Sequence, residues 1–375
     1  MKNKIFLLPI LIILLFTCRS SPDTAKKSSA PPVTTNTLTF IATGDNLFHE
    51  TIVDSSLKNG VYDFTPIYTE IKSIVESADL AFINQETVMG GESFGYSGYP
   101  AFNTPQSLAK TIADTGFDIV NHANNHAMDM GKTGLYATLD LWDTIKGITV
   151  IGARKSGESA RIITKNNIKL GFLSYTHSLN GIALPPDNPN LVSMNNKTKM
   201  AQEIDALRPL CDFLIVSMHW GDEYRLEPGR DQISLAQFLA EHNVDLIIGH
   251  HPHVLQKAQV ITLENGRKTF CIYSLGNFVS NQREKERIIG GIMAVKFTKT
   301  EQGSEIKELS ISDFGMVPVI CHFDRGFINT KVYPLYSYSE DLLKNHALKN
   351  KDLTIDFFYT TLKRMETKIY MQKPF

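Results

Sequence analysis

The most informative segment of the chain is Val244-Asp245-Leu246-Ile247-Ile248-Gly249-His250-His251-Pro252-His253. Its first half is a short apolar run typical of a buried strand, and its second half places three imidazoles within four residues. Gly249 allows a tight turn where the strand ends, and Pro252 stiffens the link between two histidines. Neutral imidazole is a common ligand of transition metals, so this stretch predicts a metal site at the edge of a sheet.

Four other segments repeat this pattern, in which an apolar run leads into carboxylate, amide or imidazole groups. The polar clusters occupy residues 44–49, 84–86, 121–126 and 219–224. In open sheets with crossover connections, ligands bind beyond the carboxyl ends of the strands. We therefore expect these five strand ends to meet in one place and to form an active site.

The order of strand-like and helical runs predicts an α/β fold. Strands alternate with helical segments at 107–113, 131–146, 200–207 and 232–241, which indicates a mostly parallel sheet with helices outside. Two hairpins, one of which turns at Asn166-Asn167, and further strands at 288–297 and 306–317 predict a second sheet packed on the first. The expected fold class is two mixed sheets flanked by helices.

The first residues predict export from the cytoplasm. A basic start precedes an apolar run over residues 5–16, whose helix would cover ~18 Å and so could not cross a ~30 Å hydrocarbon core. Residues 1–18 are therefore interpreted as a signal peptide. The sequence Leu15-Phe16-Thr17-Cys18 resembles a bacterial lipobox, which predicts a lipid on Cys18. The alternative is an ordinary signal peptide that is cleaved elsewhere.

Composition divides the rest of the chain into three parts. Residues 19–37 are rich in Ser, Thr, Pro and Lys and predict a flexible tether. Residues 38–330 are expected to form the globular domain, and residues 331–375 a C-terminal helical extension. With a lipid on Cys18, this organisation predicts an extracytoplasmic, membrane-anchored bacterial lipoprotein.

Cysteine usage and charge narrow the class of protein. Cys211, Cys271 and Cys321 are odd in number and lie in apolar or strand-like runs, which favours buried free thiols over a disulfide framework. The formal net charge of -1 comes without a basic stripe, so no nucleic-acid partner is expected.

Six motifs together resemble the CapA family, bacterial envelope proteins associated with poly-γ-glutamate capsule synthesis. They are Gly44-Asp45, Asn84-Gln85-Glu86, Ala123-Asn124-Asn125-His126-Ala127-Met128-Asp129-Met130-Gly131, His219-Trp220-Gly221-Asp222-Glu223-Tyr224, His251-Pro252-His253-Val254 and Tyr273-Ser274-Leu275-Gly276-Asn277-Phe278. This family is similar in fold to the calcineurin-like metallophosphatases. The resemblance covers roughly residues 38–323 and implies a four-layer sandwich, with two mixed sheets between helical layers.

The resemblance also implies roles for particular residues. The implied metal ligands are Asp45, Glu86, Asn125, His219, His251 and His253. His126 corresponds to the imidazole that assists the leaving group. The Asp-x-His opening of metallophosphatases is absent here, and His49 either replaces that ligand or contacts substrate. Glu223, which could bind a substrate amine, and Asn277 are the candidate substrate-binding residues.

The implied cofactor is a divalent metal, one or two ions. A ligand set of oxygen and imidazole donors without thiolate suits Mn, Zn or Fe better than Ca. His251 and His253 are predicted to be ligands and His250 not, because successive side chains of an extended segment point to opposite sides.

Two classes of function fit these features. The leading hypothesis is an envelope-anchored, metal-dependent hydrolase or transferase that acts on an anionic polymer such as polyglutamate, or on a phosphoester, with metal-activated water. The alternative is a non-catalytic component that binds the polymer and helps to export or assemble it with other capsule synthesis proteins.

Overall fold

The computed structural model describes residues 31–157 and 160–375. The predicted signal peptide, its Cys18 and the first part of the predicted tether lie outside the described residues. Within the described part of the chain, no helix is long and apolar enough to span a bilayer.

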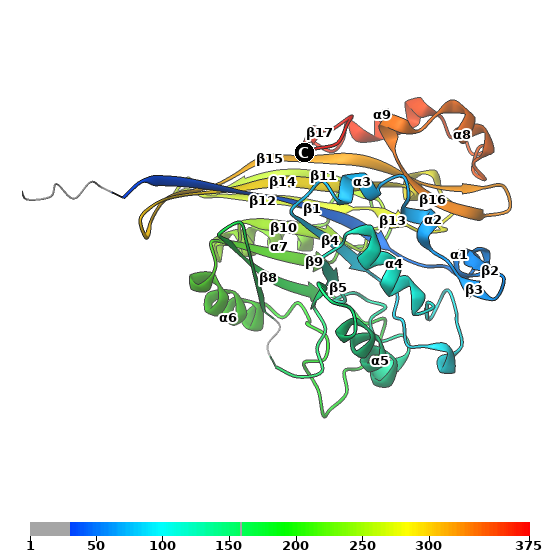
Figure 1. Ribbon diagram of the computed structural model, residues 1–375, viewed down its shortest axis with the longest axis horizontal. Helices are drawn as coiled ribbons and strands as arrows, with labels where there is room; N and C mark the ends of the chain where they lie inside the picture. The colour runs from blue at the N-terminus through cyan, green and yellow to red at the C-terminus, as the bar shows by residue number, and fades with distance from the viewer. Residues whose placement is uncertain (1–30, 158–159) are drawn as a thin grey trace, which may run out of the picture.

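The described chain builds two sheets that face each other (Figure 1). The larger sheet has the order β16-β15-β14-β1-β4-β5-β6, with β13 beside β1 and β17 beside β15. Its strands are β1 (Val33–Asn46), β4 (Leu80–Gln85), β5 (Ile119–Asn121), β6 (Thr149–Ile151), β13 (Asn277–Val279), β14 (Ile289–Gln302), β15 (Glu305–Asp324), β16 (Ile328–Pro334) and β17 (Lys368–Ile369).

The smaller sheet has the order β11-β12-β10-β9-β8-β7. Its strands are β7 (Arg161–Lys165), β8 (Ile168–Thr176), β9 (Phe213–His219), β10 (Leu246–His250), β11 (Leu255–Thr262) and β12 (Lys268–Leu275). A separate short hairpin pairs β2 (Leu57–Lys58) with β3 (Val61–Tyr62).

Helices surround the two sheets. They are α1 (Glu50–Ser56), α2 (Thr65–Tyr68), α3 (Lys72–Val75), α4 (Ser107–Thr115), α5 (Gly131–Asp143), α6 (Lys197–Leu207), α7 (Arg230–Glu241), α8 (Glu340–Asn345) and α9 (Ile355–Leu362). Helices α1–α4 share a buried cluster with the larger sheet, and α6 and α7 share another with the smaller sheet. The predicted four-layer α/β sandwich is therefore confirmed.

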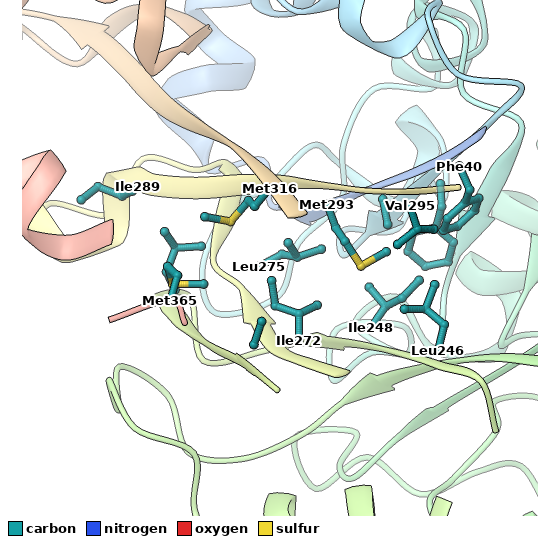
Figure 2. Close-up of a cluster of buried hydrophobic side chains, with 14 of the residues drawn as sticks. Phe40, Leu246, Ile248, Ile272, Leu275, Ile289, Met293, Val295, Met316 and Met365 are labelled. Carbon is teal, nitrogen blue, oxygen red and sulfur yellow. The ribbon is translucent and has the colours of Figure 1, made fainter. Parts of the chain in front are cut away.

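The main core lies between the two sheets (Figure 2). Alternation along β1 sends Leu38, Phe40 and Ala42 into this core, whereas Ile41 points outward to the helices. From the facing sheet, Leu246 and other apolar side chains of β10 enter the same core. Burial on both faces explains why the central strands appear in the sequence as continuous apolar runs.

The parallel pairs align the strand ends that carry the polar clusters. Strands β1, β4 and β5 run parallel to one another in the larger sheet, as do β8, β9 and β10 in the smaller one. The predicted turn at Asn166-Asn167 is also present: both residues have positive φ, 50° and 59°, as a two-residue turn between β7 and β8 requires.

Both predicted ends of the globular domain are misplaced. Strand β1 begins at Val33, upstream of the predicted boundary at residue 38, so the tether prediction is wrong for residues 33–37. These residues pair with β14, from Val33 opposite Gln302 to Thr37 opposite Thr298. Their polar composition hid the strand because they lie on an exposed part of the sheet, where no apolar alternation is needed.

The predicted C-terminal extension is part of the same domain. Strand β16 crosses the predicted boundary at residues 330–331, and β17 adds to the edge of β15. Leu343 of α8, Phe358 of α9 and Met365 join the main core. In Figure 1 this segment, in orange and red, lies along β15 at the top of the view.

Candidate metal centre

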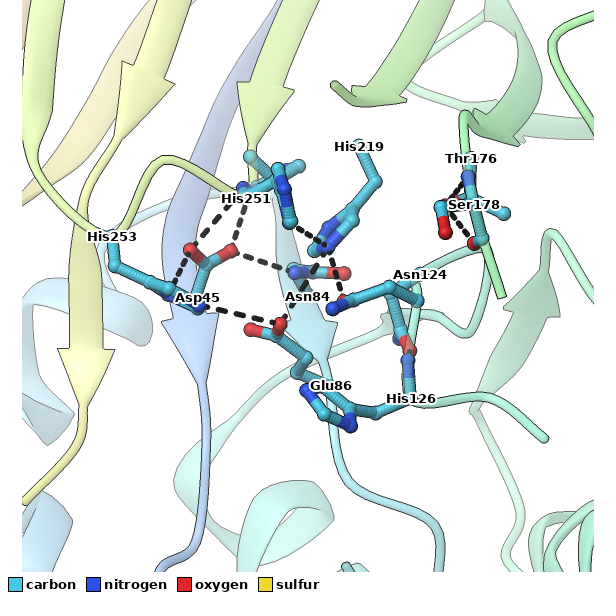
Figure 3. Close-up of polar contacts among 12 residues, drawn as sticks. Asp45, Asn84, Glu86, Asn124, His126, Thr176, Ser178, His219, His251 and His253 are labelled. Carbon is cyan, nitrogen blue, oxygen red and sulfur yellow. Dashed lines mark hydrogen bonds and ion pairs between the residues drawn. The ribbon is translucent and has the colours of Figure 1, made fainter. Parts of the chain in front are cut away.

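The implied ligands converge between the carboxyl ends of the two sheets (Figure 3). From the larger sheet, Asp45 is the next-to-last residue of β1, and Glu86 directly follows β4. From the smaller sheet, His219 ends β9, and His251 and His253 follow β10. All five side chains are buried, so the surrounding strands fix their positions.

Short distances connect these side chains into one cluster. The Asp45 carboxylate lies 3.1 Å from Nδ1 of His253, and Nε2 of His253 lies 3.7 Å from Oε1 of Glu86. Oε1 of Glu86 is in turn 3.5 Å from Nε2 of His219. Two overlapping sets of donors, one with His219 and His251 and the other with Asp45 and His253, share Glu86 and have the spacing of metal ligands.

The donors around His219 fit a cation better than they fit a proton. Nε2 of His219 lies 2.8 Å from Oδ1 of Asn125, 3.1 Å from Nδ1 of His251 and 3.5 Å from Glu86. A ring nitrogen carries at most one proton, so it can satisfy only one of these three neighbours. Both carboxylate oxygens of Glu86 are buried without a hydrogen-bond partner among the described residues. A divalent cation would satisfy all of these lone pairs at once.

Burial and neighbouring charges shift the pKa values of the Glu86 and Asp45 carboxylates in opposite directions. Burial raises the pKa of Glu86 well above its ordinary value. Burial alone also raises the pKa of Asp45, but the neighbouring imidazoles of His250 and His253 outweigh it and hold the pKa well below the usual range. Asp45 is therefore charged at neutral pH.

The pKa values of the imidazoles are also shifted in opposite directions. For His253, burial lowers the pKa, yet the carboxylates of Glu86 and Asp45 outweigh it and raise the pKa to about 9. Burial, and then the neighbouring His251, lowers the pKa of His219. Burial, and then His253, likewise lowers the pKa of His251. His219 and His251 are thus neutral at pH 7, the form in which imidazole binds a metal.

The predicted geometry of the His-x-His segment is wrong, although both histidines reach the cluster. His251 and His253 have φ values of 96° and 57°, so the backbone curls after β10 and is not extended. Gly249 is needed for a close approach, because a Cβ there would lie 2.0 Å from the Tyr273 carbonyl oxygen. His250 also faces the site, with Nδ1 3.5 Å from Asp45.

His126 lies beside the cluster with one ring nitrogen occupied. Its Nδ1 is 2.8 Å from the carboxylate of Asp129, which is its hydrogen-bond partner. The edge of its ring packs on Phe102, with 4.7 Å between ring centroids. This arrangement leaves Nε2 as the atom that can exchange a proton.

His49 lies near the cluster but outside the ligand sets. Its Nδ1 accepts a hydrogen bond of 3.2 Å from the backbone N–H of Asn281. Burial, and then the charge of His253, lowers the pKa of His49 to about 4. It is therefore neutral at pH 7 and is placed to contact a substrate or to accept a proton.

The two predicted substrate-binding residues occupy different positions. Glu223 is exposed, and its carboxylate lies within ligand spacing of His251 and His253. Asn277 is buried, and its Oδ1 lies 3.0 Å from Nδ1 of His253. Asn277 therefore orients a candidate ligand, while Glu223 can reach either a cation or a substrate amine.

Sequence reasoning missed a buried polar chain behind Asp45. The Asn84 amide donates to Asp45 over 2.8 Å, Asn121 donates to Asn84 over 2.8 Å, and the Ser174 hydroxyl donates to Asn121 over 2.6 Å. The chain runs from β1 across β4 and β5 to β8 of the other sheet. It fixes the orientation of the Asp45 carboxylate.

Sequence reasoning also missed the end of β8. The ring of His177, directly after β8, lies 4.5 Å from the ring of His251, and its Nδ1 bonds the His219 carbonyl over 3.0 Å. Asn180 accepts a hydrogen bond of 3.2 Å from the Asn125 amide. The apolar run before Thr176 had the same pattern as the other five strand ends and could have revealed this sixth one.

Comparison with known proteins identifies the family. The sequence model described as "Bacterial capsule synthesis protein PGA_cap" matches residues 39–282. The chain is 28% identical over 258 residues to capsule biosynthesis protein CapA of Bacillus anthracis, covering 64% of this chain and 60% of that protein. It is 33% identical over 184 residues to PGA biosynthesis protein CapA of Bacillus subtilis (strain 168), and this match covers 48% of this chain and 47% of that protein. The chain thus spans less than two thirds of the length of both relatives.

Solved structures with some likeness include two nucleotidases. The NAD nucleotidase of Haemophilus influenzae is 14% identical with a TM-score of 0.44, and covers 90% of this chain and 57% of that chain. The 5′-nucleotidase precursor of Thermus thermophilus is also 14% identical with a TM-score of 0.45, and covers 74% and 54%. Since the family match covers most of the described domain, this chain belongs to the bacterial capsule synthesis protein family, PGA_cap.

Proposed function

We propose that this protein is a metal-dependent hydrolase or transferase that acts on the γ-amide bonds of poly-γ-glutamate. The observation that carries the proposal is the crowding of three polar atoms around Nε2 of His219, because that nitrogen can form a hydrogen bond with only one of them. The names of the Bacillus relatives support the choice of polymer. A divalent cation bound there would act as a Lewis acid on the scissile bond and would lower the pKa of water.

The residues around the cluster supply proton transfer and orientation. Asp129 holds Nδ1 of His126, so Nε2 of His126 can give a proton to the nitrogen that leaves when the amide bond breaks. Asn277 and the chain from Ser174 to Asp45 hold the ligands in place. Hydrolysis consumes one water and yields a carboxylate and an amine, whereas transfer passes the same acyl group to an acceptor amine.

The activity is tested with the purified full chain and poly-γ-glutamate. We expect release of new amino groups in the presence of Mn²⁺ or Zn²⁺, and a loss of at least ~100-fold in His126→Ala with the metal retained. His242→Ala, which changes a histidine at the C-terminal end of α7, serves as the control.

Either of two results would sink the proposal. A metal-loaded parent that leaves the polymer intact but binds it is a polymer-binding component and not an enzyme. Turnover of a phosphodiester without turnover of the polymer assigns the metal centre to phosphoester chemistry.

We further infer that lipid on Cys18 holds the protein on the outer side of the cytoplasmic membrane, because the lipobox-like sequence precedes a domain that begins at Val33. Metabolic labelling with a fatty acid should mark the protein, and Cys18→Ser should release it from membranes. If that variant fractionates with membranes like the parent, the inference is wrong.

A further inference from the structure

Residues 281–288 lie beside the candidate metal centre, and hydrogen bonds connect them to it. The backbone N–H of Asn281 donates to His49, and the side-chain oxygen of Gln282 accepts from the Asn277 amide over 3.1 Å. The same amide donates to the Arg287 carbonyl over 2.9 Å. Asn277 contacts the candidate ligand His253 through its other side-chain atom. The backbone of this segment is thus tied to the residues that hold the site.

This segment carries two arginines whose guanidinium groups lie over aromatic rings. The guanidinium carbon of Arg287 lies 3.4 Å from the ring centroid of Tyr224, and that of Arg283 lies 4.0 Å from the ring centroid of Phe327. A guanidinium that stacks on a ring keeps its N–H donors free in its own plane. Such a group is preorganised to bind an oxyanion through two parallel hydrogen bonds.

Neither arginine forms an ion pair with a carboxylate of residues 31–157 or 160–375. In the same range, by contrast, Arg208 and Arg267 both pair with Asp245, at 3.0 Å and 2.7 Å. Arg287 is half-buried, so its charge is not fully solvated. A partly desolvated cation without a protein counter-charge favours an anionic ligand.

Tyr224 places Arg287 beside the candidate ligands. Its backbone has φ of 64°, which is unusual for a tyrosine, and its N–H donates to the Pro252 carbonyl over 2.7 Å. Its ring lies 6.1 Å from the ring of His253. The segment between the two histidine ligands therefore fixes Tyr224, and Tyr224 in turn supports the guanidinium of Arg287.

We propose that Arg287 binds an oxyanion of the substrate next to the scissile bond, with Arg283 as a second positive charge farther along the same segment. The inference rests on the proposed function, and it assigns the anionic side group of the substrate to a named residue. In poly-γ-glutamate this oxyanion is the α-carboxylate beside each γ-amide. In a phosphoester it is a non-bridging phosphate oxygen. The scissile bond is then held over the metal centre from one side.

Equilibrium binding to the full metal-loaded chain tests this inference without turnover. The probes are oligo-γ-glutamate, the same oligomer with its α-carboxylates methylated, and bis(p-nitrophenyl) phosphate. We expect Arg287→Gln to weaken binding of one anionic probe by at least ~10-fold, because hydrogen bonds to charged groups are lost. Arg287→Lys should lie in between, since it keeps the charge and loses the planar donors. The methylated oligomer should bind parent and Arg287→Gln alike.

Lys307→Gln is the matched control, because it removes one positive charge near the far end of the β14–β15 hairpin, where Lys307 pairs with Glu305. The anionic probe whose binding depends on Arg287 shows whether the bound oxyanion is a carboxylate or a phosphate oxygen. If Arg287→Gln and Lys307→Gln bind each anionic probe equally well, the inference is wrong. It is also wrong if the parent binds neither probe.

The outcome also separates this inference from the proposed activity. If the parent binds oligo-γ-glutamate through Arg287 but does not cleave it, the proposed anion site stands and the proposed activity is wrong. If Arg287→Gln cleaves the polymer as well as the parent does, the proposed activity stands and the proposed anion site is wrong. Equal metal content in the parent and variants shows that the centre itself is intact.

Discussion

Single atoms at the metal centre explain why the histidines differ in role. His251 contributes Nδ1 to the crowded region around His219, and His253 lies between the two carboxylates of the cluster. His250 is fully buried, stacks on Phe82 with 5.8 Å between ring centroids, and has its Nδ1 3.5 Å from Asp45. The first two histidines therefore have the positions of ligands, and His250 has that of a support for Asp45.

We predict that His251→Ala and His253→Ala each weaken metal binding by more than ~100-fold, beyond the range typical of outer hydrogen-bond partners. His250→Ala should cost less, because its effect passes through Asp45. Isothermal titration of the metal-free protein with Mn²⁺ or Zn²⁺ measures all three. Equal losses would place His250 among the ligands.

At the scale of elements, the C-terminal segment is joined to the sandwich by buried histidines. Nδ1 of His346, which follows α8, accepts a 3.0 Å hydrogen bond from the Leu348 N–H and must stay unprotonated to do so. Its ring meets that of His322 on β15 at 5.0 Å. His322 also bonds the Tyr338 hydroxyl over 2.7 Å. Protonation of His346 would break the contact with Leu348 and place a charge in the core.

This packing predicts a loss of stability in mild acid. Burial, and then the nearby His322, lowers the pKa of His346 from 6.5 to about 4. The unfolded chain therefore binds the proton first as the pH falls. The contribution to stability is complete above pH 6.5 and is lost between that pH and about 4, and at pH 5 the loss is about 2 kcal/mol.

Urea unfolding at pH 7.5 and pH 5 measures this effect. His346→Gln should be less stable than the parent at pH 7.5 and should lose less stability on acidification. His242→Gln, near the surface, should keep the pH dependence of the parent. A His346→Gln variant with the same pH dependence as the parent would show that His346 does not carry the effect.

At the scale of the whole molecule, the candidate ligands come from both sheets. Asp45 and Glu86 belong to the larger sheet, and His219, His251 and His253 to the smaller one. The residues that pack the sheets against each other, such as Phe40 and Leu246, are close in space but distant in sequence. A bound cation would therefore join two layers that are otherwise held by apolar packing and a few buried polar contacts.

We predict that metal binding raises the unfolding temperature of the entire domain in one step. A free metal concentration of 100 times the dissociation constant should stabilise the fold by about 2.7 kcal/mol, because the metal binds only the folded state. Scanning calorimetry with added Mn²⁺ or with a chelator measures the shift. Asp45→Asn should abolish most of it, and a parent whose transition ignores both additions would argue against a centre that bridges the sheets.

The sequence was most informative where apolar runs end in polar clusters. Such runs revealed the central strands, and the resemblance supplied an ordered ligand set that converges around Glu86. Patterns could not reveal the positive φ at His251, since curling of the backbone depends on contacts with residues distant in the chain. Residues 33–37 were missed for a related reason, because their partner strand begins more than two hundred and fifty residues later.

The length of β1 separates the start of the described domain from the candidate metal centre. The strand runs from Val33 to Asn46, so its start and the candidate ligand Asp45 are separated by roughly 40 Å at the usual rise per residue. In the lipoprotein proposed above, the lipid lies upstream of Val33, so β1 would separate the anchored end of the domain from the candidate centre by this distance. A substrate would then reach the centre at the end of the domain that is remote from its tether.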